Sequence, residues 1–210
     1  MKKIIIIGAG DHGRGVWEIL RAQNELNPQF TLAGFVDDAA DKQGLIINQI
    51  LVLGKIDRLN QTTEAYSCIL AIANPEVKKQ IKQRLAGNID YINAVHPAAT
   101  IAPSVKLGKG VIIGAGVVIA GETDIRDHIT INLNATIGHD CLLEDYCTIA
   151  PGANITGRVK ILEGADIGAN AAIIPGRIIG RWSKVGIGAV VLKDVAENTT
   201  VFGNPARVVW

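Results

Sequence analysis

Aromatic residues are scarce in this sequence, at 4% of 210 residues, so aliphatic side chains must build its core. An excess of one charge is also missing, because 21 basic residues oppose 20 acidic ones and no long basic run occurs. A protein that binds the phosphate backbone of nucleic acid normally carries such a run or patch. We therefore expect no nucleic-acid partner.

Long hydrophobic runs are absent too. The N-terminal MKKIIII contains only four consecutive isoleucines before a Gly-rich turn. This run is too short for the apolar region of a signal peptide. We interpret it as a buried strand and expect no membrane span.

Cysteine is rare, and the three that occur, Cys68, Cys141 and Cys147, do not have the spacing of metal ligands. Two of them occupy repeat positions that call for a small apolar side chain, a place that free cysteine fills well. We expect no metal site, and we infer a reducing, cytoplasmic setting.

One periodicity dominates the second half of the chain. Residues 101–196 divide into sixteen consecutive six-residue blocks, each beginning with Ile, Leu or Val. The fifth residue of each block is small or β-branched, with Arg177 as the large exception. A period of six does not fit an α-helix but is typical of a parallel β-helix, whose coils take about 18 residues each. We predict a triangular prism with the lead aliphatics inside.

The first 95 residues follow a different pattern. Strand-like segments at 2–7, 31–36, 67–72 and 89–95 alternate with helical patterns at 14–26 and 75–85. This alternation is typical of a small parallel α/β sheet. We predict two domains, a Rossmann-like α/β domain over 1–95 and the β-helix over 96–210.

The turn after the first strand has the pattern GxGxxG, which can cradle a diphosphate on backbone amides at a helix N-terminus. Three interpretations stay open: a nicotinamide dinucleotide, another nucleotide diphosphate, or a structural turn. Fewer than 100 residues are too few for a two-half dinucleotide fold, which favours the second. Asn74 contacts a base edge or caps the following helix. The expected substrate-binding residues are Gly8, Gly10, Asp11, His12, Gly13, Asp37, Asp38 and Asn74.

Among four histidines, His139 is the candidate catalytic base. It occupies the third place of its block, where the side chain should lie at a bend and point outward, and Asp140 follows it. A nearby carboxylate can fix the tautomer of a histidine that takes a proton near neutral pH. The alternative is an exposed bend residue without a role.

These features together resemble the hexapeptide-repeat acetyltransferases, specifically the sialic-acid O-acetyltransferase and UDP-amino-sugar N-acetyltransferase type found in bacillosamine synthesis. The resemblance spans essentially the whole chain and is carried by GAGDHGRGV at 8–16, FVDD at 35–38, AIAN at 71–74, VHPAATIAPS at 95–104, the blocks, IGHDC at 137–141 and VFGNPARVV at 201–209.

The resemblance implies a left-handed β-helix, a homotrimer and acetyl-CoA bound between neighbouring prisms. His139 then removes a proton from a sugar amine, Asp140 orients it, and the Gly157 N–H faces the thioester carbonyl. The residues implied to bind acetyl-CoA are Thr148, Gly157, Gly186, Gly188 and Ala189; some relatives carry a histidine in place of Thr148.

The expected function is therefore acetyl-CoA-dependent N-acetylation of a UDP- or dTDP-linked amino-dideoxy sugar, without a metal or an acyl-enzyme. Two alternatives remain: a sugar O-acetyltransferase of the sialic-acid type, and a non-catalytic trimeric scaffold. Apolar positions on the prism flanks, such as Ile112, Val118 and Ile178, favour the trimer.

Overall fold

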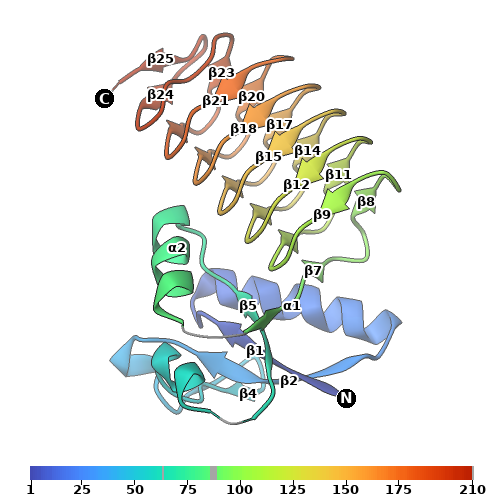
Figure 1. Cartoon of the computed structure of the whole chain (residues 1–210), viewed down its shortest axis with the longest axis vertical. Coiled ribbons are helices and arrows are strands. Elements are labelled where there is room, and N and C mark those ends of the chain that lie inside the picture. Colours follow the sequence, from blue (N-terminus) through green and yellow to red (C-terminus); the bar gives the residue numbers. More distant parts are fainter. Residues whose placement is uncertain (63, 86–88, 210) are drawn as a thin grey trace.

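The computed structural model describes residues 1–62, 64–85 and 89–209. It contains a small α/β domain and a β-helical prism (Figure 1). The prism is a left-handed parallel β-helix, which confirms the predicted fold class.

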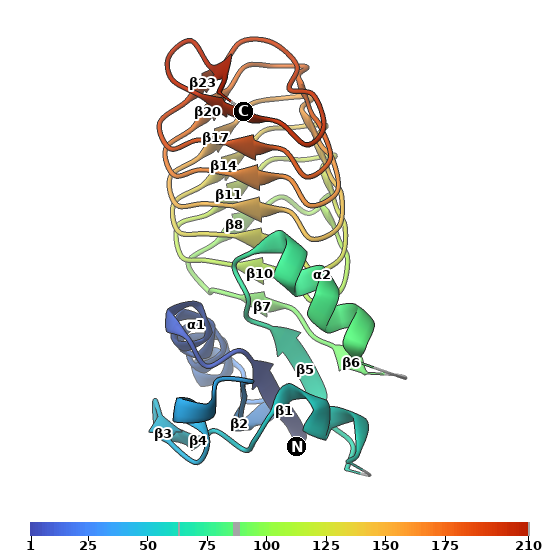
Figure 2. The ribbon, with the colours of Figure 1, turned by 90° about the vertical axis from the view of Figure 1, so that its left-hand side faces the viewer.

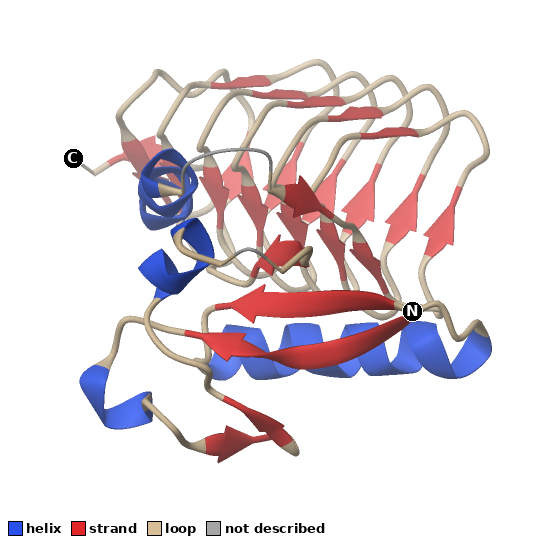
Figure 3. Ribbon diagram, turned by 60° about the horizontal axis from the view of Figure 1, so that its bottom comes forward, coloured by secondary structure: helices blue, strands red, loops and turns tan. Residues whose placement is uncertain are grey.

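The N-terminal sheet has four parallel strands in the order β2-β1-β5-β6, with α1 along one side (Figure 3). The central strand β1 is a run of isoleucines because both of its faces are covered. Ile4 and Ile6 pack with α1, whereas Ile5 and Ile7 pack in the cluster that contains Ile81 of α2. The elements are β1 (Lys2–Ile7), α1 (Asp11–Leu26), β2 (Phe30–Val36), β5 (Ser67–Leu70), α2 (Pro75–Arg84) and β6 (Asp90–Tyr91).

Between β2 and β5 the structure contains short elements that are not predicted from the sequence. They are two 3-10 helices, η1 (Ala40–Lys42) and η2 (Ile56–Asn60), and an antiparallel hairpin of β3 (Ile46–Ile47) and β4 (Ile50–Leu51). Two-residue strands are too short to leave a periodic pattern.

The expectation that 89–95 completes the sheet is wrong in part. Only β6 joins it, whereas β7 (Ala94–Val95) pairs in parallel with β10 of the prism. The reason is that Val95 lies six residues before the lead Ile101 and so extends the repeat phase.

The prism has three outer faces, built from parallel strands that pair eighteen residues apart. The exception is the C-terminal end of one face, where β24 (Thr200–Phe202) pairs with β22 (Lys184–Val185) sixteen residues apart and with the antiparallel β25 (Arg207–Val208). We call the face that the N-terminal domain covers the docking face, and we name the other two by whether their outward strand residues carry charge. The docking face contains β7, β10 (Ile112–Ile113), β13 (Thr130–Ile131), β16 (Thr148–Ile149), β19 (Asp166–Ile167), β22, β24 and β25. The uncharged face contains β8 (Thr100–Ile101), β11 (Val118–Ile119), β14 (Thr136–Ile137), β17 (Asn154–Ile155), β20 (Ala172–Ile173) and β23 (Val190–Val191). The charged face contains β9 (Lys106–Leu107), β12 (Asp124–Ile125), β15 (Leu142–Leu143), β18 (Lys160–Ile161) and β21 (Ile178–Ile179).

The prism interior follows the predicted pattern. From Ile113 to Val191 every lead aliphatic is buried in one continuous cluster, which also contains Cys141 and Cys147 from the fifth positions. Arg177, the large exception, stays partly exposed and pairs with Asp194.

The N-terminal domain covers the lower part of the docking face, with α1 beneath the first coils and α2 beside them (Figure 2). The outward residues Ala94, Ile112, Thr130 and Thr148 are consequently buried. Ile112 was expected on an unpartnered flank, and this expectation is wrong because the side chain packs in the core cluster with α1. Val118 and Ile178, on the other two faces, are 46% and 40% exposed.

Candidate active site

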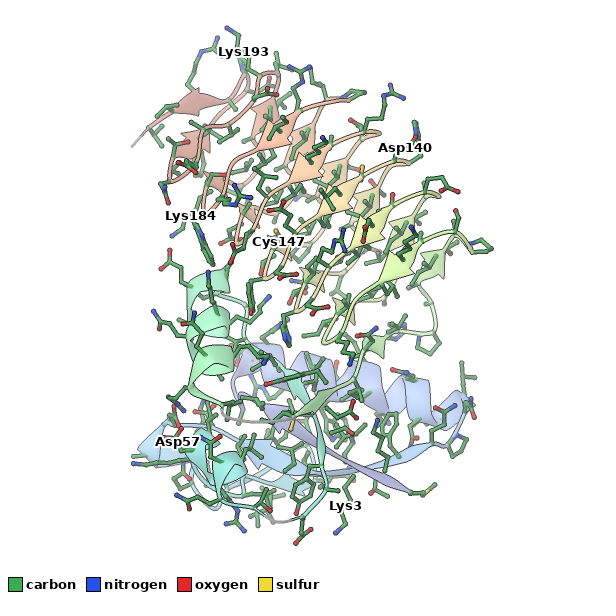
Figure 4. The ribbon with its side chains drawn as sticks, viewed as in Figure 1. Lys3, Asp57, Asp140, Cys147, Lys184 and Lys193 are labelled. Carbon is green, nitrogen blue, oxygen red and sulfur yellow. The ribbon has the colours of Figure 1, made fainter. Side chains whose placement is uncertain are left out.

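His139 and Asp140 lie at the edge of the prism between the uncharged and charged faces. Both side chains are more than half exposed, and His139 Nδ1 is 2.6 Å from a carboxylate oxygen of Asp140. The two neighbours can meet because Asp140 adopts a left-handed backbone conformation, with φ of 57°. Figure 4 places Asp140 at the prism edge away from α2. A proton held on Nδ1 by the carboxylate leaves Nε2 free to accept one.

Gly157, one coil further on, lies directly under the His139 ring. A Cβ at Gly157 would be 2.6 Å from Nε2, so any larger residue would displace the imidazole. Within the described chain, the Gly157 N–H donates to no backbone or side-chain acceptor. A proton acceptor and a free amide donor therefore lie side by side.

Two glycines of the GxGxxG turn are required by packing. A Cβ at Gly8, whose φ is 106°, would be 2.7 Å from Ala71 O, and a Cβ at Gly13 would overlap Gly8 O. At Gly10 the nearest atom to a Cβ would be Lys42 Nζ at 3.7 Å, an ordinary contact. Gly10 is the N-cap of α1, and no side chain caps the helix there. Of the three glycines, Gly10 is the one with space for a side chain around it.

The two acidic residues expected to touch a ribose or base are already engaged within the chain. Asp37 accepts from the N–H groups of Ala9 and Ala39 and pairs with Lys42. These partners hold the pKa of Asp37 below its usual value, although burial opposes them. Asp37 thus joins the glycine turn to η1.

Asp38 lies on the opposite side of this strand end. Its carboxylate accepts from the Ile56 N–H and pairs with Arg84 at 2.7 Å. The position therefore ties η2 and α2 to the sheet, and its oxygens do not converge with those of Asp37.

Asn74 caps α2, because its side-chain oxygen accepts from the Val77 N–H at 3.0 Å. The sequence left open whether Asn74 contacts a base edge or caps the helix, and the structure shows the helix cap. Asp11, at the first position of α1, is exposed and pairs with Arg14 at 2.5 Å.

His12 lines a cavity of about 300 Å³ between α1 and the prism edge that joins the docking and uncharged faces. Burial, and then the charge of Lys78, lower the pKa of His12 to about 4, so the ring is neutral at physiological pH. Its Nε2 atom is buried without a hydrogen-bond partner in the described structure. The cavity is lined by Asp11, His12, Gly15, Val16, Glu18, Ile19, His96, Gly114, Ala115, Asn132 and Leu133.

The residues expected to bind the far part of acetyl-CoA lie in different surroundings. Space is open around Gly188, whereas a Cβ at Gly186 would overlap the Phe202 ring. Ala189 is fully buried in the prism core, and its N–H donates to Gly186 O, so it has no group to offer a coenzyme.

Thr148 also lies away from the expected coenzyme site. The side chain is buried on the docking face, and its hydroxyl donates to Ala73 O at 2.8 Å and accepts from Lys78 Nζ at 3.4 Å. The hydroxyl therefore joins the two domains.

Sequence analysis missed Lys78, which is fully buried and bonded to the docking face. The signal was available: Lys78 lies between Pro75 and Ile81 on the stripe of α2 that is buried, where an apolar residue is expected. His128, the other histidine of a prism bend, is buried between Tyr91 and Tyr146.

In residues 1–62, 64–85 and 89–209, no group of three or more His, Cys, Asp or Glu side chains is arranged to hold a metal ion. None of the helices in those ranges has the length and apolarity needed to cross a membrane.

Comparison with known proteins adds independent information. Residues 3–85 match the PglD N-terminal domain family. The chain is 35% identical over 210 residues to the GDP-perosamine N-acetyltransferase of Escherichia coli O157:H7, covering 96% of this chain and 94% of that protein.

Two solved structures resemble the whole chain. The acetyltransferase domain of PglB from Neisseria gonorrhoeae, in complex with acetyl coenzyme A, has a TM-score of 0.89 at 32% identity over 99% of both chains. PerB from Caulobacter crescentus, in complex with CoA and GDP-perosamine, has a TM-score of 0.87 at 32% identity, covering 100% of this chain and 98% of that one.

Proposed function

This chain belongs to the hexapeptide-repeat acetyltransferases that carry a PglD N-terminal domain, and from that premise we propose that it acetylates the amine of a nucleotide-linked sugar. The chain is an acetyl-CoA-dependent acyltransferase. The observation that carries the choice of substrate is the match along 96% of the chain to a GDP-perosamine N-acetyltransferase.

In the proposed reaction the sugar amine attacks the thioester carbonyl carbon directly. A carbon–nitrogen bond forms, the carbon–sulfur bond breaks, and CoA leaves as a thiolate that then takes a proton. His139 Nε2 accepts the proton that the amine loses, and Asp140 holds the ring through Nδ1 at 2.6 Å. The Gly157 N–H, beneath this ring, donates to the developing oxyanion.

The proposed nucleotide site is the open part of the glycine turn around Gly10, with the sugar in the cavity lined by His12. A neutral His12 can donate or accept a hydrogen bond there without repelling a protonated amine. The family resemblance implies UDP or dTDP, and GDP joins them because a relative that matches 96% of this chain is named for GDP-perosamine.

His139 and this cavity lie on different edges of one prism, separated by the uncharged face. The base that serves the cavity therefore comes from a second chain, which is the physical reason for the proposed homotrimer. A cyclic assembly in which the His139 edge of one chain meets the cavity edge of the next supplies three identical sites.

The uncharged face suits such an interface. Its outward residues carry no charge, and several are exposed, whereas the docking face is covered by the chain's own N-terminal domain. The outward residues are Thr100, Val118, Thr136, Asn154, Ala172 and Val190.

Transfer to a sugar hydroxyl, as in a sugar O-acetyltransferase, is the competing reaction. Incubation with acetyl-CoA and a panel of GDP-, UDP- and dTDP-linked amino sugars separates the two. Hydroxylamine cleaves an ester product but leaves an amide intact. We expect a hydroxylamine-stable acetyl product, whereas a labile product would favour O-acetylation and the absence of transfer to any of these sugars would contradict the proposed function.

The location in the cell stays a prediction. All three cysteines are free and buried, as the inference of a reducing compartment assumes.

A further inference from the structure

A lysine of the N-terminal domain is buried completely in the joint between the two domains. Lys78 projects from α2, and its Nζ atom approaches four oxygens of the prism. They are His128 O at 3.0 Å, Thr130 Oγ1 at 3.2 Å, Tyr146 O at 3.4 Å and Thr148 Oγ1 at 3.4 Å. One ammonium group thus connects α2 to two successive coils of the prism.

A second hydrogen bond between the domains has its donor in the prism and its acceptor in the N-terminal domain. The Thr148 hydroxyl donates to Ala73 O at 2.8 Å. Ala73 lies in the segment between β5 and α2, and Ala71 at the start of that segment is the residue against which Gly8 packs. The same short segment therefore touches both the glycine turn and the prism.

The energetics argue against a purely stabilising role. None of the four oxygens bound by Lys78 belongs to a carboxylate, so the buried charge has no counter-ion among its hydrogen-bond partners. Burying a cation in this way costs several kcal/mol, and a well-packed apolar residue often stabilises such a position more. The three N–H groups of the ammonium, shared among four fixed oxygens, nevertheless define one position of α2 in a way that apolar contacts do not.

The surroundings keep this joint dry. His128 is stacked on Tyr146, with ring centroids 5.5 Å apart, and meets the edge of Tyr91 at 4.6 Å. In such a low-dielectric site each hydrogen bond to the ammonium is stronger than in water, and a shift of α2 that breaks one of them costs more free energy.

We propose that Lys78 and Thr148 form an interdomain pin, which sets the position of segment 71–74, and of the glycine turn that packs against Ala71, relative to the prism. The effect of the pin on catalysis rests on the proposed function. Lys78 and Thr148 are positioning residues, since neither touches the proposed substrate site. They act by keeping the sugar amine within attacking range of the thioester, where a misplacement of about 1 Å can lower the rate about 100-fold.

The test uses the full-length enzyme with Lys78→Met, Thr148→Val and the double variant. Lys79→Met is the matched control, because Lys79 is the next residue of α2 and also reaches the prism, but through an ion pair with Glu163 in which both side chains are about one-third exposed. Such a solvent-accessible pair contributes little to holding α2 in place. We expect Lys78→Met to lower kcat about 10- to 100-fold. The KM for acetyl-CoA and the Kd for whichever of GDP, UDP or dTDP raises the wild-type Tm should stay unchanged.

The double variant should lose no more kcat than Lys78→Met alone, because both substitutions remove one shared connection. Hydrogen exchange should accelerate at backbone amides of 71–78 in each pin variant but not in Lys79→Met. If Lys78→Met fails to fold, Thr148→Val supplies both readouts.

Two outcomes would overturn the pin. One is a folded Lys78→Met or Thr148→Val enzyme with wild-type kcat and wild-type exchange in 71–78; the other is additive losses in the double variant. If the wild type acetylates no amino sugar, the proposed function fails by itself, and the exchange measurement still decides whether the pin holds the segment.

Discussion

In the proposed mechanism His139 acts through one atom, Nε2, because Nδ1 is occupied by Asp140. We expect His139→Ala to lower kcat about 10²–10⁴-fold, the usual contribution of a general base. Nucleotide affinity should not change, since the cavity lies on another edge of the prism. Steady-state kinetics together with calorimetry of nucleotide binding check both expectations, and full turnover by the variant would remove His139 from the mechanism.

Lys78 makes the stability of the protein depend on pH. Burial lowers its pKa from the ordinary 10.5 to about 7, and the neighbouring Cys147 and Asp166 oppose this shift. Between these two values the unfolded chain binds a proton that the folded protein does not. The free energy of unfolding should therefore rise with pH from about 7 to about 10, with no contribution from Lys78 to the slope below about 7.

Urea unfolding of the wild type and Lys78→Met at pH 6–10 measures this effect. The stability of the wild type relative to the variant should increase with pH across that window. A difference that is independent of pH would mean that Lys78 titrates as an ordinary lysine.

Some of the side-chain contacts in the candidate site could be predicted from the sequence, and others could not. The pairing of His139 with Asp140 could be predicted because neighbours in a bend need only one left-handed residue to meet. The roles of Asp37 and Asp38 could not, because their partners Lys42 and Arg84 become neighbours only when the chain folds.

At the scale of elements, the glycine turn offers a matched pair of substitutions. Gly13→Ala should destabilise the protein by about 1–3 kcal/mol or more, because its Cβ would overlap Gly8 O and push α1 from β1. Gly10→Ala should cost less than about 1 kcal/mol, since its Cβ meets only Lys42 Nζ at 3.7 Å. Chemical denaturation of both variants checks the contrast, and equal losses would contradict the packing account.

Elements with a strong period of hydrophobic residues could be predicted from the sequence, whereas very short elements could not. The six-residue repeat determines both the strands and the interior of the prism, because every coil meets the same steric demands. The β3–β4 hairpin has strands of two residues, which leave no pattern to recognise.

At the scale of the whole molecule, the proposed interface can be tested through Val118, which is 46% exposed on the uncharged face. Val118→Glu places a charge where two prisms should meet, and desolvating it without a partner opposes assembly. The sedimentation mass should fall from about three times 22.3 kDa to that of one chain.

Lys160→Glu, on the charged face, is the control and should leave the mass unchanged. A wild-type mass of one chain at micromolar concentration would contradict the trimer outright.

How the two domains pack against each other could not be predicted from the sequence. The repeat predicts three equivalent outer faces, and nothing in its period says which one the N-terminal domain will cover. The burial of Ile112 follows from that docking, as does the burial of Thr130 and Thr148.

Mixing two inactive variants tests most directly that each catalytic site is built from two chains. His139→Ala lacks the base, and Gly15→Leu fills the cavity, where nothing now lies within 4 Å of a Cβ. In randomly mixed trimers, about a quarter of the sites combine an open cavity with a neighbour's intact His139, so about a quarter of wild-type activity should return. Mixed trimers that form but remain inactive would contradict the shared site.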